Sequence, residues 1–157
     1  MNDIERAKAA YKAITDFLDD SNLKYEARPN DNVVFVTITG EDFPVTLMFT
    51  VRAEAQRVET YSQIPIEIKS EKAVDVAMAC AAINNRIAYG KFCLYFDRSV
   101  CTYENSEYID GLEGFSSEYG RRIVATAYSI VEAYNDKIYA VNRGVLGVKE
   151  LLASLKK

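Results

Sequence analysis

Four strand-like segments between residues 23 and 63 limit the fold more than any other feature of this sequence. They cover residues 23–27, 33–39, 45–52 and 57–63, and they alternate apolar with polar side chains or are rich in β-branched residues. Such patterns are typical of strands that bury one face. Because only short turn clusters separate them, each segment is expected to pair antiparallel with the next. The last, RVETYSQ, is the most polar and is predicted to be an edge strand.

An amphipathic helix is predicted ahead of these strands, over about residues 3 to 20. Its apolar residues recur at helical spacing: Ile4, Ala7, Tyr11, Ile14 and Leu18. Charged residues fill the positions between them, which indicates a surface helix. Asn2 or Asp3 can cap its first turn.

Further helices are predicted after residue 65. The second begins near Ser70, a good N-cap residue, and its body, KAVDVAMACAAINNRI, is rich in Ala. The third begins at Ser116 or Ser117 and ends at Gly144, with Phe115 placed to pack against its first turn. A short final helix has an apolar side made of Val148, Leu151, Leu152 and Leu155.

A hairpin and a loop are predicted between the second and third helices. Phe92, Leu94 and Phe96 alternate with other residues, a turn at residues 97–99 follows, and residues 100–104 return. Residues 99–120 contain acidic residues but neither Lys nor Arg, and most of this stretch is predicted to be a solvated loop. Its acidic residues are Glu104, Glu107, Asp110, Glu113 and Glu118.

The order of the elements, α-β(3–4)-α-β-β-α with a short final helix, predicts the α+β class. We expect one antiparallel sheet of about five or six strands, flanked by helices, because the strands and helices are segregated along the chain. The chain of 157 residues is long enough for one domain with its own core. Residues 1–157 are therefore interpreted as a single domain, with residues 143–157 as a C-terminal extension.

Charge and hydropathy bear on the possible partners. The formal net charge of −4 lacks the basic surface that nucleic acids require, so no nucleic-acid partner is expected. No apolar run is long enough to cross a bilayer, and the charged N-terminal segment lacks the pattern of a secretory signal. We therefore expect a cytoplasmic protein with no membrane partner.

The chain contains three cysteines, Cys80, Cys93 and Cys101, without the spacing of a redox or zinc motif. Three free thiols are predicted, as is usual in a reducing cytoplasm. A disulfide between Cys93 and Cys101 is the less favoured alternative. A three-residue hairpin loop would place Tyr95, not Cys93, opposite Cys101.

The absence of His excludes the common catalytic and zinc-binding arrangements. The acidic residues lack the spacing of a calcium-binding loop, and the Gly-Lys pair of YGKFC lacks the pattern of a phosphate-binding loop. We therefore expect no enzyme activity, no catalytic or cofactor-binding residues, no metal and no cofactor.

The sequence INNR, at the end of the second helix, allows two interpretations. Asn84, Asn85 and Arg86 could form a small polar site. Alternatively, since Asn tolerates left-handed backbone, they could end the helix before Gly90. The structural interpretation is favoured.

The segment from INNR through AYGKFCLYFD resembles the YbjN-domain family. The matching residues are Asn84, Gly90, Phe92 and the turn at Asp97 and Arg98, and YIDGLEGFSSEYGRRIVATAYSIVEAY resembles the loop and final helix of the family. The resemblance is best over about residues 70 to 142. It implies a fold like that of type III secretion chaperones, which are small, acidic, often dimeric and bind unfolded segments of client proteins. It supplies no catalytic residues, and Asn84, Gly90, Phe92 and Asp97 are interpreted as structural.

These observations lead to two functional hypotheses, whereas a third, an enzyme that uses carboxylates or a thiol, is disfavoured by the absence of His. The first is a non-enzymatic protein-binding module, either chaperone-like or a regulatory adaptor, with a protein or peptide client. The alternative is a small-molecule sensor that regulates signal transduction, with a pocket between the sheet and the helices. A homodimer is also expected, with the short C-terminal helix as its contact.

Overall fold

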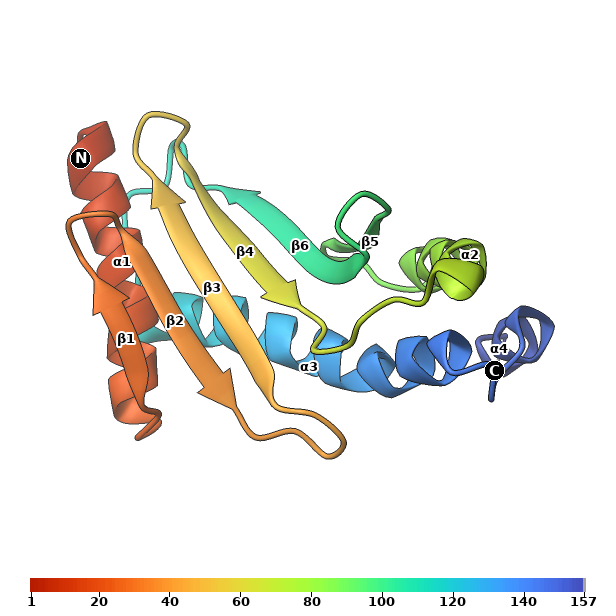
Figure 1. Cartoon of the computed structure of the whole chain (residues 1–157). Helices are drawn as coiled ribbons and strands as arrows, with labels where there is room; N and C mark the ends of the chain where they lie inside the picture. The colour runs from red at the N-terminus through yellow and green to blue at the C-terminus, as the bar shows by residue number, and fades with distance from the viewer. Residues whose placement is uncertain (157) are drawn as a thin grey trace.

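A six-stranded antiparallel sheet with helices on one face forms the centre of the computed structural model, which describes residues 1–156 (Figure 1). The strand order is β1-β2-β3-β4-β6-β5. The predicted α+β class and the sheet of five or six strands are therefore confirmed. No helix within residues 1–156 combines the length and the apolar character needed to span a membrane.

The first helix, α1, covers Asp3–Asp20 as predicted. Asn2 is the N-cap: its side-chain oxygen accepts a hydrogen bond from the Glu5 backbone N–H at 2.9 Å. The Glu5 carboxylate in turn accepts from the Asn2 backbone N–H at 2.9 Å. This reciprocal pair satisfies two donors that the first turn would otherwise leave without partners.

Four strands follow as a meander: β1 (Tyr25–Arg28), β2 (Val33–Ile38), β3 (Val45–Arg52) and β4 (Arg57–Gln63). Apart from Thr50, their buried side chains lie on the face that the helices cover. The apolar members of this set are Val34, Val36, Val45, Leu47, Phe49, Val51 and Val58. The alternation in the sequence therefore identified the core face correctly.

The prediction that β4 is an edge strand was wrong. β4 pairs with β3 on one side and with β6 on the other, so it lies inside the sheet. Its polar character has another cause: Arg57, Glu59 and Tyr61 point to the face without helices. The inward side chains of this strand include Thr60 and Ser62, which are small and buried.

The second helix, α2, covers Ala73–Asn84 and follows a 3₁₀ turn, η1, at Ser70–Lys72. The predicted N-cap role of Ser70 is wrong, because Ser70 lies within the turn and Lys72 precedes α2 without a side-chain cap. Asn142 holds this region instead. Its amide accepts from the Lys69 backbone N–H at 2.9 Å and donates to the Glu67 carbonyl at 2.8 Å.

The hairpin consists of β5 (Lys91–Tyr95) and β6 (Val100–Tyr108). Its loop is one residue longer than the three-residue alternative, since Tyr95 pairs with Val100. β6 is longer than predicted, and its extension brings Glu107 into the sheet. The predicted loop is therefore confined to the residues between β6 and the next helix.

The long helix α3 (Ser117–Asn142) packs beneath the sheet, and the short α4 (Val148–Ser154) packs against α2 (Figure 1). Phe115 contacts Tyr119 in the first turn of α3 edge to face, with ring centroids 4.8 Å apart, as the sequence predicted. Gly120 lets α3 approach α1, because a Cβ atom there would overlap the Ala13 carbonyl oxygen.

Candidate functional site

One face of the sheet carries no helix. The helices α1 and α3 lie behind the other face, so that β2, β3 and β4 are seen directly in Figure 1. Strand alternation sends every second side chain to this open face. The open face is therefore the surface on which residues of several strands can act together.

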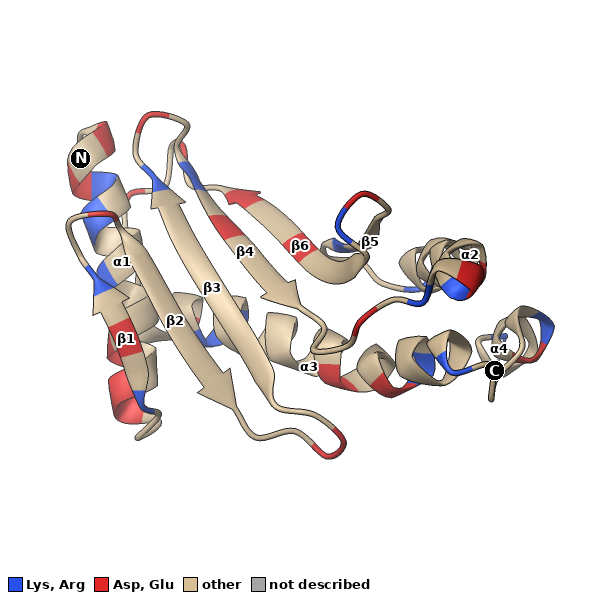
Figure 2. Cartoon of the chain, viewed as in Figure 1, with Lys and Arg blue, Asp and Glu red and all other residues tan. Residues whose placement is uncertain are grey.

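A hollow with a volume of about 620 Å³ lies on this open face, and we call it the trough. Its middle is formed by Met48, Thr50, Thr60 and Tyr61 of β3 and β4. Arg52, Arg57 and Glu59 lie at one end. Gly90, Lys91, Glu104 and Asn105 lie at the other, whereas Ser106 of β6 lies opposite Glu59. Figure 2 shows these acidic and basic positions along β4 and β6, while the middle of β3 is uncharged.

Glu59 joins two arginines at the first end of the trough. Its carboxylate accepts from Arg52 Nε at 3.1 Å and from Arg57 Nε at 2.8 Å. Burial pushes the pKa of Glu59 upward, but the hydrogen bonds and charges of the two arginines outweigh burial and hold this pKa below its usual value. Glu59 is therefore a fixed negative charge at neutral pH.

Glu104 organises the other end. Its carboxylate accepts hydrogen bonds from the Tyr95 hydroxyl at 2.8 Å and the Thr102 hydroxyl at 3.1 Å. Burial acts to raise the pKa of Glu104, but the hydrogen bonds from Tyr95, Cys93 and Thr102 and the charge of Lys91 lower it overall. Burial and the neighbouring carboxylate raise the pKa of Cys93 to about 11, so its thiol stays protonated.

The chemistry of the trough suits binding rather than proton transfer. Both carboxylates are ionised at neutral pH, whereas a general base works best with a pKa near the working pH. The protonated Cys93 thiol is a poor nucleophile. Counting Arg52, Arg57 and Lys91 against the two carboxylates leaves one positive charge, 3 − 2, on a chain whose net charge is −4.

Three of the four residues singled out from the sequence lie together beside the trough. The Asn84 amide donates to the Phe92 carbonyl at 3.0 Å and accepts from the Phe92 N–H at 2.7 Å. Gly90, with φ of +72°, turns the chain between them. A Cβ atom on Gly90 would lie 2.6 Å from the Tyr103 hydroxyl. These residues hold the join between α2 and β5.

Asp97, the fourth residue, lies apart in the hairpin loop. It borders another hollow with Pro65 and Glu67. The left-handed residue of this turn is Ser99, with φ of 54°. Asp97 therefore belongs to the turn and does not line the trough.

The expectation that Asn84 and Asn85 end α2 through left-handed backbone is wrong. The C-cap Asn85 has φ of −71°, an ordinary right-handed value. The positive φ follows later, at Gly90. The contribution of Asn84 comes from its side chain, which reaches a residue eight positions along the chain.

The cysteines are all free thiols. Cys93 pairs with Thr102 on the open face of the sheet, whereas Cys101 points to the helices. The two thiols therefore lie on opposite faces and do not form a disulfide. The Sγ atoms of Cys80 and Cys101 lie 3.6 Å apart, both buried between α2 and β6. Proximity to Cys80 and burial raise the pKa of Cys101.

The acidic residues between β5 and α3 are dispersed. Glu107 of β6 pairs with Arg122 of α3, and Glu118 pairs with Arg121 within α3. Within residues 1–156, no three Cys, Asp or Glu side chains come close enough to hold a metal ion. These carboxylates therefore act as individual surface charges.

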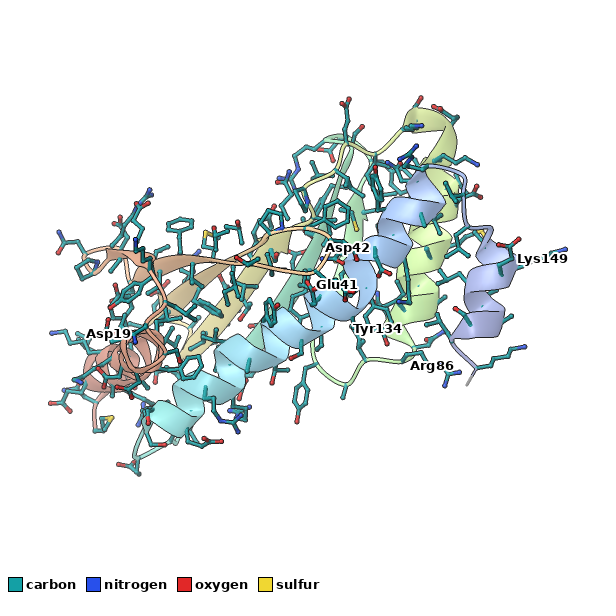
Figure 3. The ribbon with its side chains drawn as sticks, turned by 90° about the horizontal axis from the view of Figure 1, so that it is seen from below. Asp19, Glu41, Asp42, Arg86, Tyr134 and Lys149 are labelled. Carbon is teal, nitrogen blue, oxygen red and sulfur yellow. The ribbon has the colours of Figure 1, made fainter. Side chains whose placement is uncertain are left out.

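Another hollow lies on the helical side, between α3 and α4. It has a volume of about 470 Å³ and is lined by Arg86, Tyr134, Lys137 and Leu155, among others. Figure 3 shows Arg86 and Tyr134 on this side of the molecule, at the end of α2 and on α3. The sequence predicted neither this hollow nor the trough, because each is assembled from elements far apart in the chain.

Comparison with solved structures shows the same fold elsewhere. A structure described as "Crystal structure of YbjN, a putative transcription regulator from E. coli" matches with a TM-score of 0.59 and 13% sequence identity. The match covers 82% of this chain and 90% of that one. At this identity the likeness concerns the fold alone. A search of curated proteins finds no match to this chain.

The sequence itself matches a family model over residues 10–140, which is most of the chain. That family is YbjN, described as "Putative bacterial sensory transduction regulator". The matched region begins in α1 and ends in α3, so it includes the whole sheet, the trough and the join at Asn84. This chain belongs to the YbjN family.

Proposed function

We propose that this chain is a non-enzymatic regulator that binds a segment of a partner protein in the trough. The observation that carries the proposal is the open sheet face, where an uncharged floor lies between two charged ends. The family description as a regulator supports the same class of function. A regulator of this kind works by forming and releasing a complex.

The shape and chemistry of the trough favour a polypeptide segment. Met48 and Tyr61 are half-buried and offer apolar contact along the floor. Glu59 is held by two arginines and Glu104 by two hydroxyl groups, so both charged ends are ordered before a partner arrives. Preorganised polar groups around an apolar centre are typical of protein-binding surfaces.

The test compares two substitutions on β3 that face the same way. Met48→Glu puts a charge on the floor of the trough, and Thr46→Glu puts the same charge two residues along, at an exposed position outside it. Affinity purification from the native cells should yield a partner that wild type and Thr46→Glu retain. Met48→Glu should lose it, and calorimetry with the purified partner should give the same order.

Equal binding by all three forms, with unchanged thermal stability, would show that the trough is not the contact. If wild type retains no partner that also binds in purified form, the protein-binding function itself is contradicted.

A small-molecule sensor is the second candidate, and the volume of the trough favours it. About 620 Å³ lies within the range of typical ligand pockets, roughly 300–1,000 Å³. The sequence had placed such a pocket between sheet and helices, but the trough lies on the opposite face. A panel of cytoplasmic metabolites should then raise the melting temperature of wild type and of Thr46→Glu, but not of Met48→Glu.

A further inference from the structure

β6 is nearly twice as long as the strand beside it. It runs over nine residues, Val100–Tyr108, whereas β5 has five. The pairing between them ends at Lys91 and Glu104. Figure 1 shows β5 beside only the first part of β6. The second part therefore has a neighbouring strand, β4, on one side only.

The direction of the backbone groups in this second part follows from the pairing with β4. The Ile109 N–H bonds the Gln56 carbonyl, and the Ile64 N–H bonds the Cys101 carbonyl, at the two ends of the pairing. In an antiparallel pair, hydrogen-bonded residues alternate with residues whose backbone groups point away. Odd-numbered residues of β6 thus bond β4, and even-numbered residues point to the other side.

Thr102 and Glu104 use these outward groups to pair with β5, but Ser106 and Tyr108 do not. Within residues 1–156 the N–H and C=O groups of Ser106 and Tyr108 have no hydrogen-bond partner in the protein. Gly90 turns the preceding chain away from the sheet at this level. The carbonyl of Tyr89, the residue just before Gly90, accepts a hydrogen bond from the Tyr103 hydroxyl at 3.0 Å and is not paired with the β6 backbone.

At the outer edge of β5, by contrast, a side chain bonds the outward-pointing backbone groups. There the Asn84 amide satisfies both backbone groups of Phe92, which keeps another strand from pairing at that residue. Ser106 and Tyr108 have no such cover: both are exposed, and Tyr108 is 71% exposed.

We infer that an extended segment of a partner protein pairs with β6 at residues 106–108 and adds a short strand to the sheet in line with β5. The inference rests on the proposed protein-binding function and states how the partner is held. The outward N–H and C=O groups of Ser106 and Tyr108 supply up to four backbone hydrogen bonds. Because Ser106 also lines the trough, the added strand would run along its rim.

The surroundings define the chemistry of this segment. Side chains that point to the open face meet the trough, whose lining has one excess positive charge, so acidic residues are expected at these positions. Side chains that point to the helical face meet a hollow of only about 10 Å³ beside Glu107, Arg122 and Thr126. Small residues are expected there. The partner segment thus alternates acidic residues with small ones.

Ser106→Pro is the decisive substitution. Proline removes the outward N–H and places its ring where the added strand would lie. The pairing of β6 with β4 remains, since Ser106 does not use its backbone groups there. Ser106→Ala is the matched control, because it removes the hydroxyl group and keeps the N–H. Circular dichroism and thermal unfolding should show that both variants fold.

The probe is a library of short random peptides displayed on phage and selected on the wild-type protein. Selected peptides should show the alternation of acidic and small residues, and synthetic copies should bind Ser106→Ala like wild type. Ser106→Pro should weaken binding at least about tenfold, which corresponds to losing one or two hydrogen bonds. In hydrogen-exchange spectra, the Ser106 and Tyr108 amides should become protected when the peptide binds.

The outcomes separate this inference from the proposed function. Peptides that bind Ser106→Pro as well as wild type, but fail on Met48→Glu, would overturn strand addition and leave the trough as the binding surface. Selected peptides that bind without protecting the Ser106 and Tyr108 amides would also overturn it. If no peptide is enriched over an unrelated acidic protein, both strand addition and the protein-binding function are contradicted.

Discussion

The side-chain amide of Asn84 makes both of its hydrogen bonds to the backbone of one residue, Phe92, at 2.7 and 3.0 Å. It thereby takes the place of a neighbouring strand at the edge of β5. Asn is well suited to this role, because one amide group offers a donor and an acceptor side by side.

Asn84→Ala should therefore lower the free energy of unfolding by about 1–3 kcal/mol, because two partly buried backbone groups lose their partner. Asn85→Ala, at the exposed next position, should change it by less than about 0.5 kcal/mol. Urea unfolding of the two variants measures the difference. Equal effects would mean that the contact with Phe92 contributes little.

Gly90→Ala should be more costly than Gly111→Ala. Both glycines have positive φ, +72° and +74°, so both substitutions introduce backbone strain of roughly 1–2 kcal/mol. Only at Gly90 would the new Cβ atom meet other groups, the Tyr103 hydroxyl at 2.6 Å and the Glu104 carbonyl at 2.7 Å. The extra loss for Gly90→Ala should be about 1–3 kcal/mol in thermal unfolding, and no extra loss would contradict this packing.

Three free thiols per chain are expected when the protein is unfolded in the absence of reductant and titrated. A count of one would reveal a disulfide. Such a disulfide would join Cys80 and Cys101, because their Sγ atoms are 3.6 Å apart. A sample reduced beforehand serves as the control and should give three in either case.

Cys93 should react slowly with iodoacetamide near pH 8, although it is partly exposed. Burial and the Glu104 carboxylate raise its pKa to about 11, and only the thiolate reacts. Glu104→Gln removes the negative charge, lowers the pKa of Cys93 and should accelerate alkylation several-fold. Mass spectrometry of the labelled peptides measures the rate. A slower or unchanged rate in the variant would contradict this arrangement.

A homodimer remains our prediction for the assembly state. Leu151 of α4 is fully buried within its own chain, but Leu152 is 42% exposed and remains available for a contact. Light scattering should give twice the chain mass of 17.7 kDa, and Leu152→Lys should shift it toward one chain. Ala153→Lys, on the adjacent exposed position, is the control. A wild-type mass near that of one chain would rule the dimer out.

The fold was largely predictable because its signals are local. The stripe of apolar residues in α1 and the alternation in β3 each lie within one element, and both predictions are confirmed. The errors within the sheet concern β4 and the end of β6, where polar side chains were interpreted as an edge strand and a loop. A central strand of this sheet can carry polar side chains because one face of the sheet has no helices over it.

The candidate site was not predictable for a different reason. The trough combines side chains of β3, β4, β5 and β6, and no spacing in the sequence shows that Met48 and Glu104 share one surface. The family resemblance identified Asn84, Gly90 and Phe92, but it did not predict the hydrogen bonds between the Asn84 side chain and the Phe92 backbone. These hydrogen bonds depend on how the chain turns at Gly90, and that turn is set by three-dimensional packing.

The position of β6 between β4 and β5 has a consequence for biosynthesis. β4 ends at Gln63, but the strand that covers its free side is complete only when Tyr108 has been made, 108 − 63 = 45 residues later. At about 5–20 residues per second, the ribosome needs roughly 2–9 seconds for this stretch. During that interval the nascent meander exposes the long edge of β4, and a holding factor that shields it until β6 arrives would favour correct folding.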